Sequence, residues 1–381
     1  MWARRLAYVL CLAAMILWAA ALSWPRVWAG HNDFMQLYVG GSLAGTSELY
    51  SSDANRAMAE QVHFWMPAVQ FVRLPYYAAL LKPLATLPYH VAYLMFQSGC
   101  LAAALAFAFL TRTRSPGVPW FVLISIPVLT GFANGQDVMI VLALSAAAVY
   151  LDQAKRPGLA GSCLALCTIK FHLFVFTPIA LLMHRRWRFA ASAALGVALE
   201  LAISFAVAGR HWPMQYAEFL GNPVLHPAPY ILPNVHGIAG TWVPLEIMLA
   251  LALAASTAYL CRRAKSFPAA FTLSVFASLL VARHSYIQDC ALLLLVPSFL
   301  QPESNVVRQL SIVLLSPFPY FLLMLDRPWG LVTPTLLLLW FVALAADACG
   351  LIPPRKAVGP LHSGASMESG VTPLAESTAG G

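Results

Sequence analysis

The chain has 381 residues, of which 60% are hydrophobic and only 10% are charged, and its mean hydropathy is +0.72. Soluble domains carry roughly 25% charged residues, so this composition excludes an ordinary soluble protein and indicates an all-α, polytopic membrane protein. The formal net charge is +8. The basic residues follow the connections between apolar segments, however, which argues against a nucleic-acid partner.

In chain order, the first feature is Arg4 and Arg5 before an apolar run from Leu6 to Leu22. The run is too long for a typical signal peptide and no clear cleavage site follows it, so we expect an uncleaved first spanning helix. Further apolar segments bring the expected total to about 10–13 spans, some of them tilted, broken or merged. The segments lie at residues 6–24, 90–110, 118–133, 137–151, 159–169, 171–183, 189–208, 242–260, 268–282, 290–300, 310–325 and 331–346.

The connections predict one transmembrane domain over residues 1–352 with two long outer loops, at 25–89 and 209–241. Within the first loop, residues 71–88 contain three prolines and predict a helix lying at the membrane surface. Aromatic residues are dense in both loops, and they either anchor the chain at the interface or pack against a sugar face. The tail at 353–381 is rich in Gly, Ser, Thr and Pro and predicts cytoplasmic disorder.

The basic residues predict the orientation in the membrane. Most of them fall in alternate connections, which favours an even number of spans with both termini in the cytoplasm. The connections assigned to the cytoplasm contain Arg4, Arg5, Arg112, Arg114, Lys155, Arg156, Arg185, Arg186, Arg188, Arg262, Arg263, Lys265, Arg308, Arg355 and Lys356.

Polar turns interrupt the apolar chain at four places, all on the outer side in this topology. They contain Asp33, the stretch Asn134–Asp137, Lys170 with His172, and the stretch Arg283–Asp289. Ionisable groups at membrane depth are costly and usually face the bundle interior or a functional cavity. The convergence of four such turns on one face therefore predicts a site there.

Each of these residues also has a purely structural interpretation. Asp33 could be a solvated loop acid, and Lys170 could extend to the membrane surface without binding a ligand. His284 could be a hydrogen-bonded interfacial histidine. Asp289 could cap the helix that follows it, and Arg283 could pair with Asp289. Glu200 lies in mid-helix with no evident partner.

The turns resemble glycosyltransferase family 87, whose GT-C-fold members include mycobacterial polyprenol-phosphate-mannose-dependent mannosyltransferases. The segment from Asp33 to Tyr50 looks like the first-loop signature of the family. Residues 71–88, 134–137 and 284–297 resemble its juxtamembrane segment, its Gly-Gln turn and its late His…Tyr…Asp-Leu segment, in the same order. The Lys170 turn, followed later by RRWR at 185–188, also fits. The sequence departs from the pattern at Arg73, Leu74 and His172, where Tyr, Pro and Pro are usual.

The resemblance implies an inverting sugar transfer, with mannose as the expected sugar, from a polyprenyl-phosphate donor to a lipid or glycan acceptor. Asp33 is the implied general base. The implied donor-phosphate contacts are His284, Lys170, Arg73 and Arg283, and the implied supporting residues are Tyr38, Gln136, Tyr286 and Asp289. The protein would lie in a bacterial inner membrane, among membrane lipids, with the site facing the periplasm.

The phosphate leaving group explains why one carboxylate could suffice. The second pKa of a phosphate monoester is near 6, so the leaving oxygen needs no strong general acid, and the site needs only a base and groups that stabilise the phosphate. The sequence contains no nucleotide-binding loop and no Asp-x-Asp motif, so we expect no cofactor and no essential metal. Cys163 and Cys167 share a helix face, but no metal ligand accompanies them at a suitable spacing. No feature indicates an oligomeric state.

A transporter or flippase for a lipid-linked or small anionic substrate is the alternative function. Such a protein would also combine many spans with buried charge. We find no inverted repeat between the halves of the chain, and the polar residues gather at one face instead of the midplane, which disfavours this alternative. A non-catalytic scaffold is disfavoured because it has no need for Asp33 and the RHSYIQD segment (283–289) together.

Overall fold

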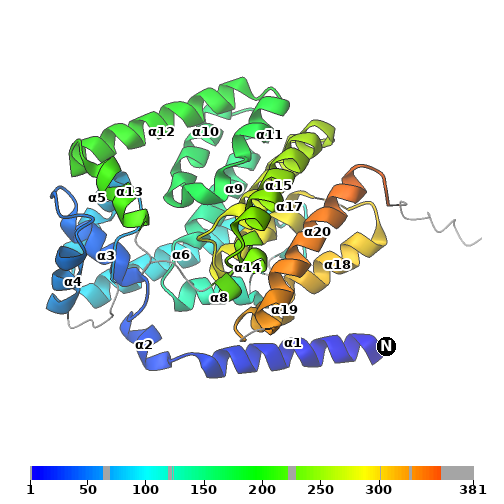
Figure 1. Ribbon diagram of the computed structural model, residues 1–381, viewed down its shortest axis with the longest axis horizontal. Coiled ribbons are helices and arrows are strands. Elements are labelled where there is room, and N and C mark those ends of the chain that lie inside the picture. Colours follow the sequence, from blue (N-terminus) through cyan, green and yellow to red (C-terminus); the bar gives the residue numbers. More distant parts are fainter. Residues whose placement is uncertain are drawn as a thin grey trace, which may run out of the picture.

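The structure is a computed structural model that describes residues 2–62, 69–118, 122, 124–221, 229–300, 302–325 and 328–352. These residues form helices and no strands (Figure 1). The all-α prediction is therefore confirmed, and the predicted disordered tail at 353–381 lies outside the described residues. The first half of the chain forms α1 (Trp2–Ala21), α2 (Trp24–Ala29), α3 (Phe34–Leu43), α4 (Ser52–Gln61), α5 (Pro75–Ala85), α6 (Tyr89–Thr111), α8 (Ile126–Ala133), α9 (Val138–Gln153), α10 (Pro157–Leu166), η1 (Cys167–Phe174) and α11 (Thr177–Met183).

The second half of the chain is also helical over its described residues. Its longest elements are α12 (Trp187–Ala208), α15 (Val243–Arg263) and α20 (Val332–Ala348). The remaining elements are α13 (Trp212–Leu220), η3 (Pro229–Ile231), α14 (Val235–Ala239), α16 (Phe267–Val281), η4 (Ile287–Leu294), α17 (Leu295–Phe299), α18 (Asn305–Leu315), α19 (Pro317–Leu323) and η5 (Trp329–Leu331).

Five helical segments of the described chain are long and apolar enough to cross a membrane, or up to seven if each of two bent pairs is one span. This number is lower than the 10–13 expected from the sequence. The difference arises because α9 and α16 are shorter than 18 residues, and because the segment expected at 310–325 divides into α18 and α19 with a bend of 54°. The segments expected at 159–169 and 171–183 also divide differently, since η1 continues α10 as one candidate span.

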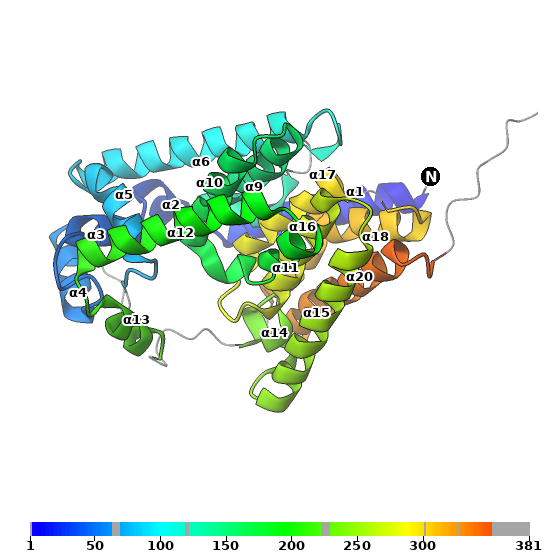
Figure 2. The same cartoon turned by 90° about the horizontal axis from the view of Figure 1, so that it is seen from above.

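Helix α16 forms the centre of the bundle. It is apolar around its whole circumference, and thirteen of its fifteen residues are buried, as expected for a helix enclosed by others. Helices α6, α9, α10 and α12 pack side by side in that order (Figure 2). The outermost of them, α12, exposes Leu195 and Leu199 by 73% and 61%, which fits a surface that faces lipid acyl chains.

The long outer loop predicted at 25–89 is mostly helical, with α3, α4 and α5 forming a layer at one end of the molecule (Figure 1). The helix predicted at 71–88 is present as α5. The aromatic residues of this region divide into two groups. Trp24 and Trp28 are exposed, as interfacial anchors would be, whereas Tyr50, Tyr76 and Tyr77 are buried and pack inside the layer.

Helical structure is interrupted at each polar turn. Between α8 and α9 the chain reverses at Gly135, whose φ is +61°. Within η1, Lys170 leaves helical geometry, with φ −126° and ψ 56°. Between α16 and η4 the chain is extended at Tyr286. The polar side chains at these breaks are not used up by regular helix. Four of them, those of Asp33, Gln136, Lys170 and Asp289, are joined by hydrogen bonds.

Candidate active site

Asp33 lies in the turn between α2 and α3. It occupies the N-cap position of α3, where an aspartate commonly accepts hydrogen bonds from the helix, yet its side chain makes no capping hydrogen bond. Instead, its Oδ2 accepts a hydrogen bond of 2.6 Å from Nε2 of Gln136. The side chain of Asp33 therefore serves a contact across the bundle, 103 residues along the chain, and not the local helix.

The turn that carries Asp33 is held rigidly. Its backbone N–H donates to the carbonyl of Asn134 at 3.0 Å. The neighbouring Asn32 donates through Nδ2 to the carbonyl of Ala133 at 3.0 Å and to the hydroxyl of Tyr93 at 3.2 Å. Phe34, on the other side of Asp33, is fully buried among aromatic rings. These contacts dock the α2–α3 turn on the α8–α9 turn.

Gln136 is the centre of the hydrogen-bond network. Its Oε1 accepts from Nζ of Lys170 at 3.1 Å and from Nη2 of Arg73 at 3.3 Å. Lys and Arg have only donors, so the amide must turn its oxygen toward them and its N–H group toward Asp33. The orientation of this amide thus follows from its partners.

Two buried carboxylates neutralise the two cations. Arg73 binds Asp137 in a bidentate pair, with Nε–Oδ2 and Nη2–Oδ1 distances of 3.0 and 3.1 Å. Lys170 Nζ lies 2.8 Å from Asp289 Oδ1 and 3.5 Å from Asp137 Oδ1. Both carboxylate side chains are fully buried. Burial alone would raise the pKa of Asp137, but the charges of Arg73 and Lys170 and the hydrogen bonds from Arg73 hold it below its ordinary value.

Asp289 combines a local and a long-range role. Its Oδ2 accepts a hydrogen bond of 2.9 Å from the backbone N–H of Tyr286 and so caps η4, while its Oδ1 binds Lys170. Tyr286 lies in the same electrostatic environment. Burial, with the negative charges of Asp289 and Asp33, raises the pKa of Tyr286 to about 12, so its hydroxyl is a proton donor at neutral pH.

The remaining predicted site residues are His284, Arg283 and Tyr38. His284 and Lys170 both lie within electrostatic range of His172. Arg283 lies apart from the network, because its guanidinium pairs with Glu246 of α15 at 2.7 and 2.9 Å. Tyr38 donates its hydroxyl to the carbonyl of Leu87 at 2.9 Å and thereby joins α3 to the end of α5.

Two features of the site region were missed from the sequence. Asp137 was recognised only as part of a polar turn, although buried Arg73 and Lys170 together require more than one carboxylate. Glu200 has a partner after all, since Thr168 donates to its Oε2 at 2.6 Å and also bonds the hydroxyl of Tyr76 at 2.9 Å. The sequence around Thr168 carries no pattern that indicates this contact.

Gly135→Ala is expected to lower the stability of the protein by about 1–3 kcal/mol, the usual cost of overpacking. A Cβ at this position would lie 2.5 Å from Oδ1 of Asn32 and 2.8 Å from Cβ of Phe34, and φ is already +61°. The measurement is the melting temperature in detergent. Gly158→Ala is the matched control, since no atom lies within 4 Å of its added Cβ. Equal melting temperatures for the two variants would contradict the close approach of the two turns.

No group of three or more His, Cys, Asp or Glu side chains within the described ranges is arranged to hold a metal ion. The expectation of metal-independent chemistry remains a prediction.

The model of glycosyltransferase family 87 matches residues 71–282. The match extends from just before α5 to just after α16 and includes Arg73, Gln136, Asp137 and Lys170. Comparisons with curated proteins and with solved structures find no match. Because the match covers more than half of a helical chain with several candidate membrane spans, the protein belongs to glycosyltransferase family 87 and is a membrane glycosyltransferase.

Proposed function

We propose that the protein transfers mannose from a polyprenyl-phosphate donor to a lipid or glycan acceptor at the outer face of the membrane, with Asp33 as general base. In the proposed step, Asp33 removes the proton of the acceptor hydroxyl as its oxygen attacks the anomeric carbon. The bond from that carbon to the phosphate oxygen breaks, and polyprenyl phosphate leaves. One displacement of this kind inverts the anomeric configuration.

The observation that carries the proposal is the position of Asp33 at the edge of a buried charge network. Its Oδ2 is bound by Gln136 at 2.6 Å, whereas Oδ1 accepts no hydrogen bond from any described residue. The residue is partly exposed, unlike Asp137 and Asp289. Of the three carboxylates, Asp33 is therefore the one that an acceptor hydroxyl could reach.

The network supports Asp33 as a base through Gln136. An amide whose oxygen accepts from two cations is polarised, so that its N–H group becomes a stronger donor. Gln136 receives such bonds from Arg73 and Lys170. Its bond to Asp33 holds the carboxylate in one orientation.

We assign the first donor-phosphate contact to His284. Lys170 is 3% exposed and Arg73 is 8% exposed, and the charge of each is matched by a carboxylate. We therefore propose that Lys170 and Arg73 do not touch the donor phosphate. They attract it from the buried interior and hold Gln136 in position. Arg283 is half exposed, and we propose that it attracts the phosphate at the mouth of the site.

The proposed orientation places the polar network at the periplasmic side of a bacterial inner membrane. Asp137 immediately precedes α9, and the basic pair Lys155 and Arg156 follows the other end of this helix. The preference of basic connections for the cytoplasm supports an outward-facing network.

The test uses purified protein in liposomes with radiolabelled polyprenyl-phosphate mannose and a membrane lipid extract as acceptor source. We expect a new glycoside whose anomeric configuration is the inverse of that in the donor. Movement of the intact labelled donor between leaflets, without glycoside formation, would identify a transporter and contradict the proposal. Transfer from a nucleotide sugar under the same conditions would contradict the donor assignment.

Gln136→Leu is expected to lower kcat by about 10- to 100-fold, the equivalent of one hydrogen bond to a charged group. The donor KM should change little, because Gln136 acts through Asp33. Both constants are measured in the transfer assay. Gln70→Leu is the control for loss of a buried amide, since Gln70 bonds Ser52 and Tyr50 instead. A rise in KM with unchanged kcat would place Gln136 in donor binding instead.

A further inference from the structure

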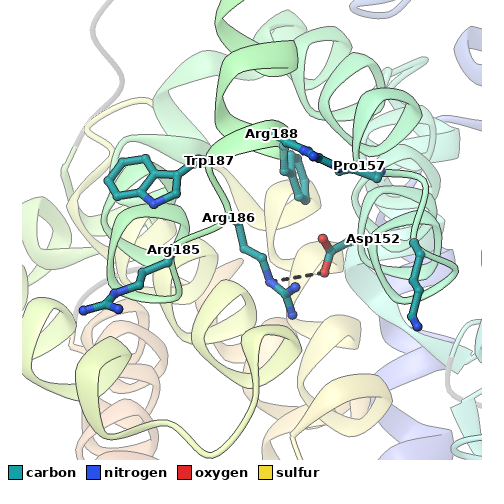
Figure 3. A pocket seen from close by; sticks show the side chains of 8 residues that line it. Asp152, Pro157, Arg185, Arg186, Trp187 and Arg188 are labelled. Carbon is teal, nitrogen blue, oxygen red and sulfur yellow. Dashed lines mark ion pairs between the residues drawn. The ribbon is translucent and has the colours of Figure 1, made fainter.

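Basic side chains line a cavity at the connections from α9 to α10 and from α11 to α12 (Figure 3). The turn that joins α9 to α10 supplies Lys155, and Asp152 lies in the last turn of α9. The turn that joins α11 to α12 supplies Arg185 and Arg186, and Arg188 lies in the first turn of α12. Arg186 extends across the cavity toward Asp152 (Figure 3).

The cavity and the active-site network occupy opposite ends of α9. Asp137 precedes the first residue of this helix and Asp152 is its penultimate residue. At 1.5 Å per residue, the two positions are about 22 Å apart along the helix axis. This separation approaches the thickness of a membrane core, so the cavity belongs to the other membrane face, which the basic residues assign to the cytoplasm.

The lining of the cavity is strongly cationic. Four basic side chains, those of Lys155, Arg185, Arg186 and Arg188, line the cavity together with one carboxylate, that of Asp152. Asp152 is 6% exposed, and its buried Oδ2 has no hydrogen bond from the described residues but lies 3.5 Å from Nε of Arg186. One buried carboxylate cannot balance four cations, so the cavity retains a positive charge that suits an anionic group.

Each turn has a basic residue at a position with positive φ, a backbone conformation that glycine adopts more easily than other residues. Each turn has the hydrogen bonds of a Schellman motif, with Arg156 N–H donating to Leu151 and Arg186 N–H donating to Leu181 at 2.8 and 2.9 Å. The left-handed residue of such a motif is usually glycine. Here it is Lys155, with φ +58°, and Arg185, with φ +52°. No other non-glycine residue of the described chain has positive φ.

Exposed apolar side chains lie close in sequence to the residues that line the cavity. Leu182 and Met183 precede the second turn, each 47% exposed, and Leu159 follows the first turn, 53% exposed. Trp187 lines the cavity and is 58% exposed, which is typical of tryptophan at a membrane interface. A ligand with a phosphate and adjacent acyl chains matches both the charge and these apolar side chains.

We propose that the cavity binds the phosphate group of an anionic phospholipid of the cytoplasmic leaflet. Basic pockets between membrane helices on the cytoplasmic side are suited to such headgroups. The phosphate enters the cavity and is attracted by the positive charge of the lining residues Arg185, Arg188 and Lys155, while Arg186 stays paired with Asp152. The acyl chains extend along Leu182 and Met183. This site is separate from the proposed sugar transfer and does not depend on it.

The test measures lipid binding by native mass spectrometry of the full chain in detergent, titrated with phosphatidylglycerol or phosphatidylcholine. The variant is Lys155→Gly/Arg185→Gly, which removes two charges and also relieves two positive-φ positions. We expect it to bind phosphatidylglycerol about tenfold or more weakly than the native protein, with a melting temperature in lipid-free detergent that is not lowered. Arg262→Gln/Arg263→Gln removes the same charge from the end of α15 and should bind phosphatidylglycerol as the native protein does.

Undiminished binding by the glycine variant, an equal loss in the α15 variant, or equal binding of the two lipids would overturn the proposal. A third arm replaces lipid with inorganic phosphate and follows the melting temperature. Stabilisation by inorganic phosphate that the glycine variant lacks, with no lipid binding, would assign the cavity to a soluble phosphate and overturn the lipid source.

Discussion

Asp33→Asn is expected to lower kcat for sugar transfer by about 10²–10⁴-fold, the range attributed to a general base. Asparagine has nearly the same shape as aspartate, and its side-chain oxygen can still accept the hydrogen bond that Gln136 donates at 2.6 Å. The folded structure should therefore persist while the proton acceptor is lost. Asp137 and Asp289 cannot replace it, because both are fully buried and paired with cations.

The measurement is formation of labelled glycoside in liposomes, with the melting temperature of each protein as the test of folding. Asp53→Asn is the matched control, since its side chain in α4 is 92% exposed and pairs with Arg56. Both proteins should keep the same donor KM. Transfer at the native rate by Asp33→Asn would remove Asp33 as the base, and loss of native transfer in EDTA would contradict metal-independent chemistry.

Arg73→Leu is expected to destabilise the protein by about 3–5 kcal/mol, the usual cost of breaking a buried ion pair. The change leaves the fully buried Asp137 with Lys170 at 3.5 Å as its remaining cation. It also removes the bidentate hydrogen bonds that help to lower the pKa of Asp137. Much of the loss should therefore be the cost of an unpaired charge and not of missing packing.

A double variant separates these two causes. Arg73→Leu/Asp137→Leu removes both charges, and it should recover most of the stability lost in the single variant because replacing a whole buried pair with apolar residues is often near neutral. Unfolding in a denaturing detergent series measures both. Arg283→Leu is the control, since this half-exposed arginine pairs with Glu246 and should cost about 1 kcal/mol or less. A double variant no more stable than Arg73→Leu would contradict the charge-pair explanation.

The sequence by itself determined the class of protein, the family and the polar turns. Twenty-residue apolar stretches can be recognised without a structure, because the bilayer imposes their length and composition. The turns of Asp33, Gln136, Lys170 and Asp289 were recognisable for the same reason, since charged groups interrupting such stretches are costly unless they have a function. Their common location on one face followed from the alternation of basic connections.

Only the tertiary structure decided which of these residues are partners. Arg73 pairs with Asp137, 64 residues away, and Lys170 pairs with Asp289, 119 residues away. Arg283 pairs with Glu246 and not with the nearby Asp289. The number of spans was also undetermined, because the apolar pattern does not show that α9 and α16 are shorter than 18 residues or that the segment at 310–325 bends by 54° between α18 and α19. The pattern of apolar residues indicates the environment of each segment. Charge pairing depends instead on the distances between segments, which are set only when the helices pack.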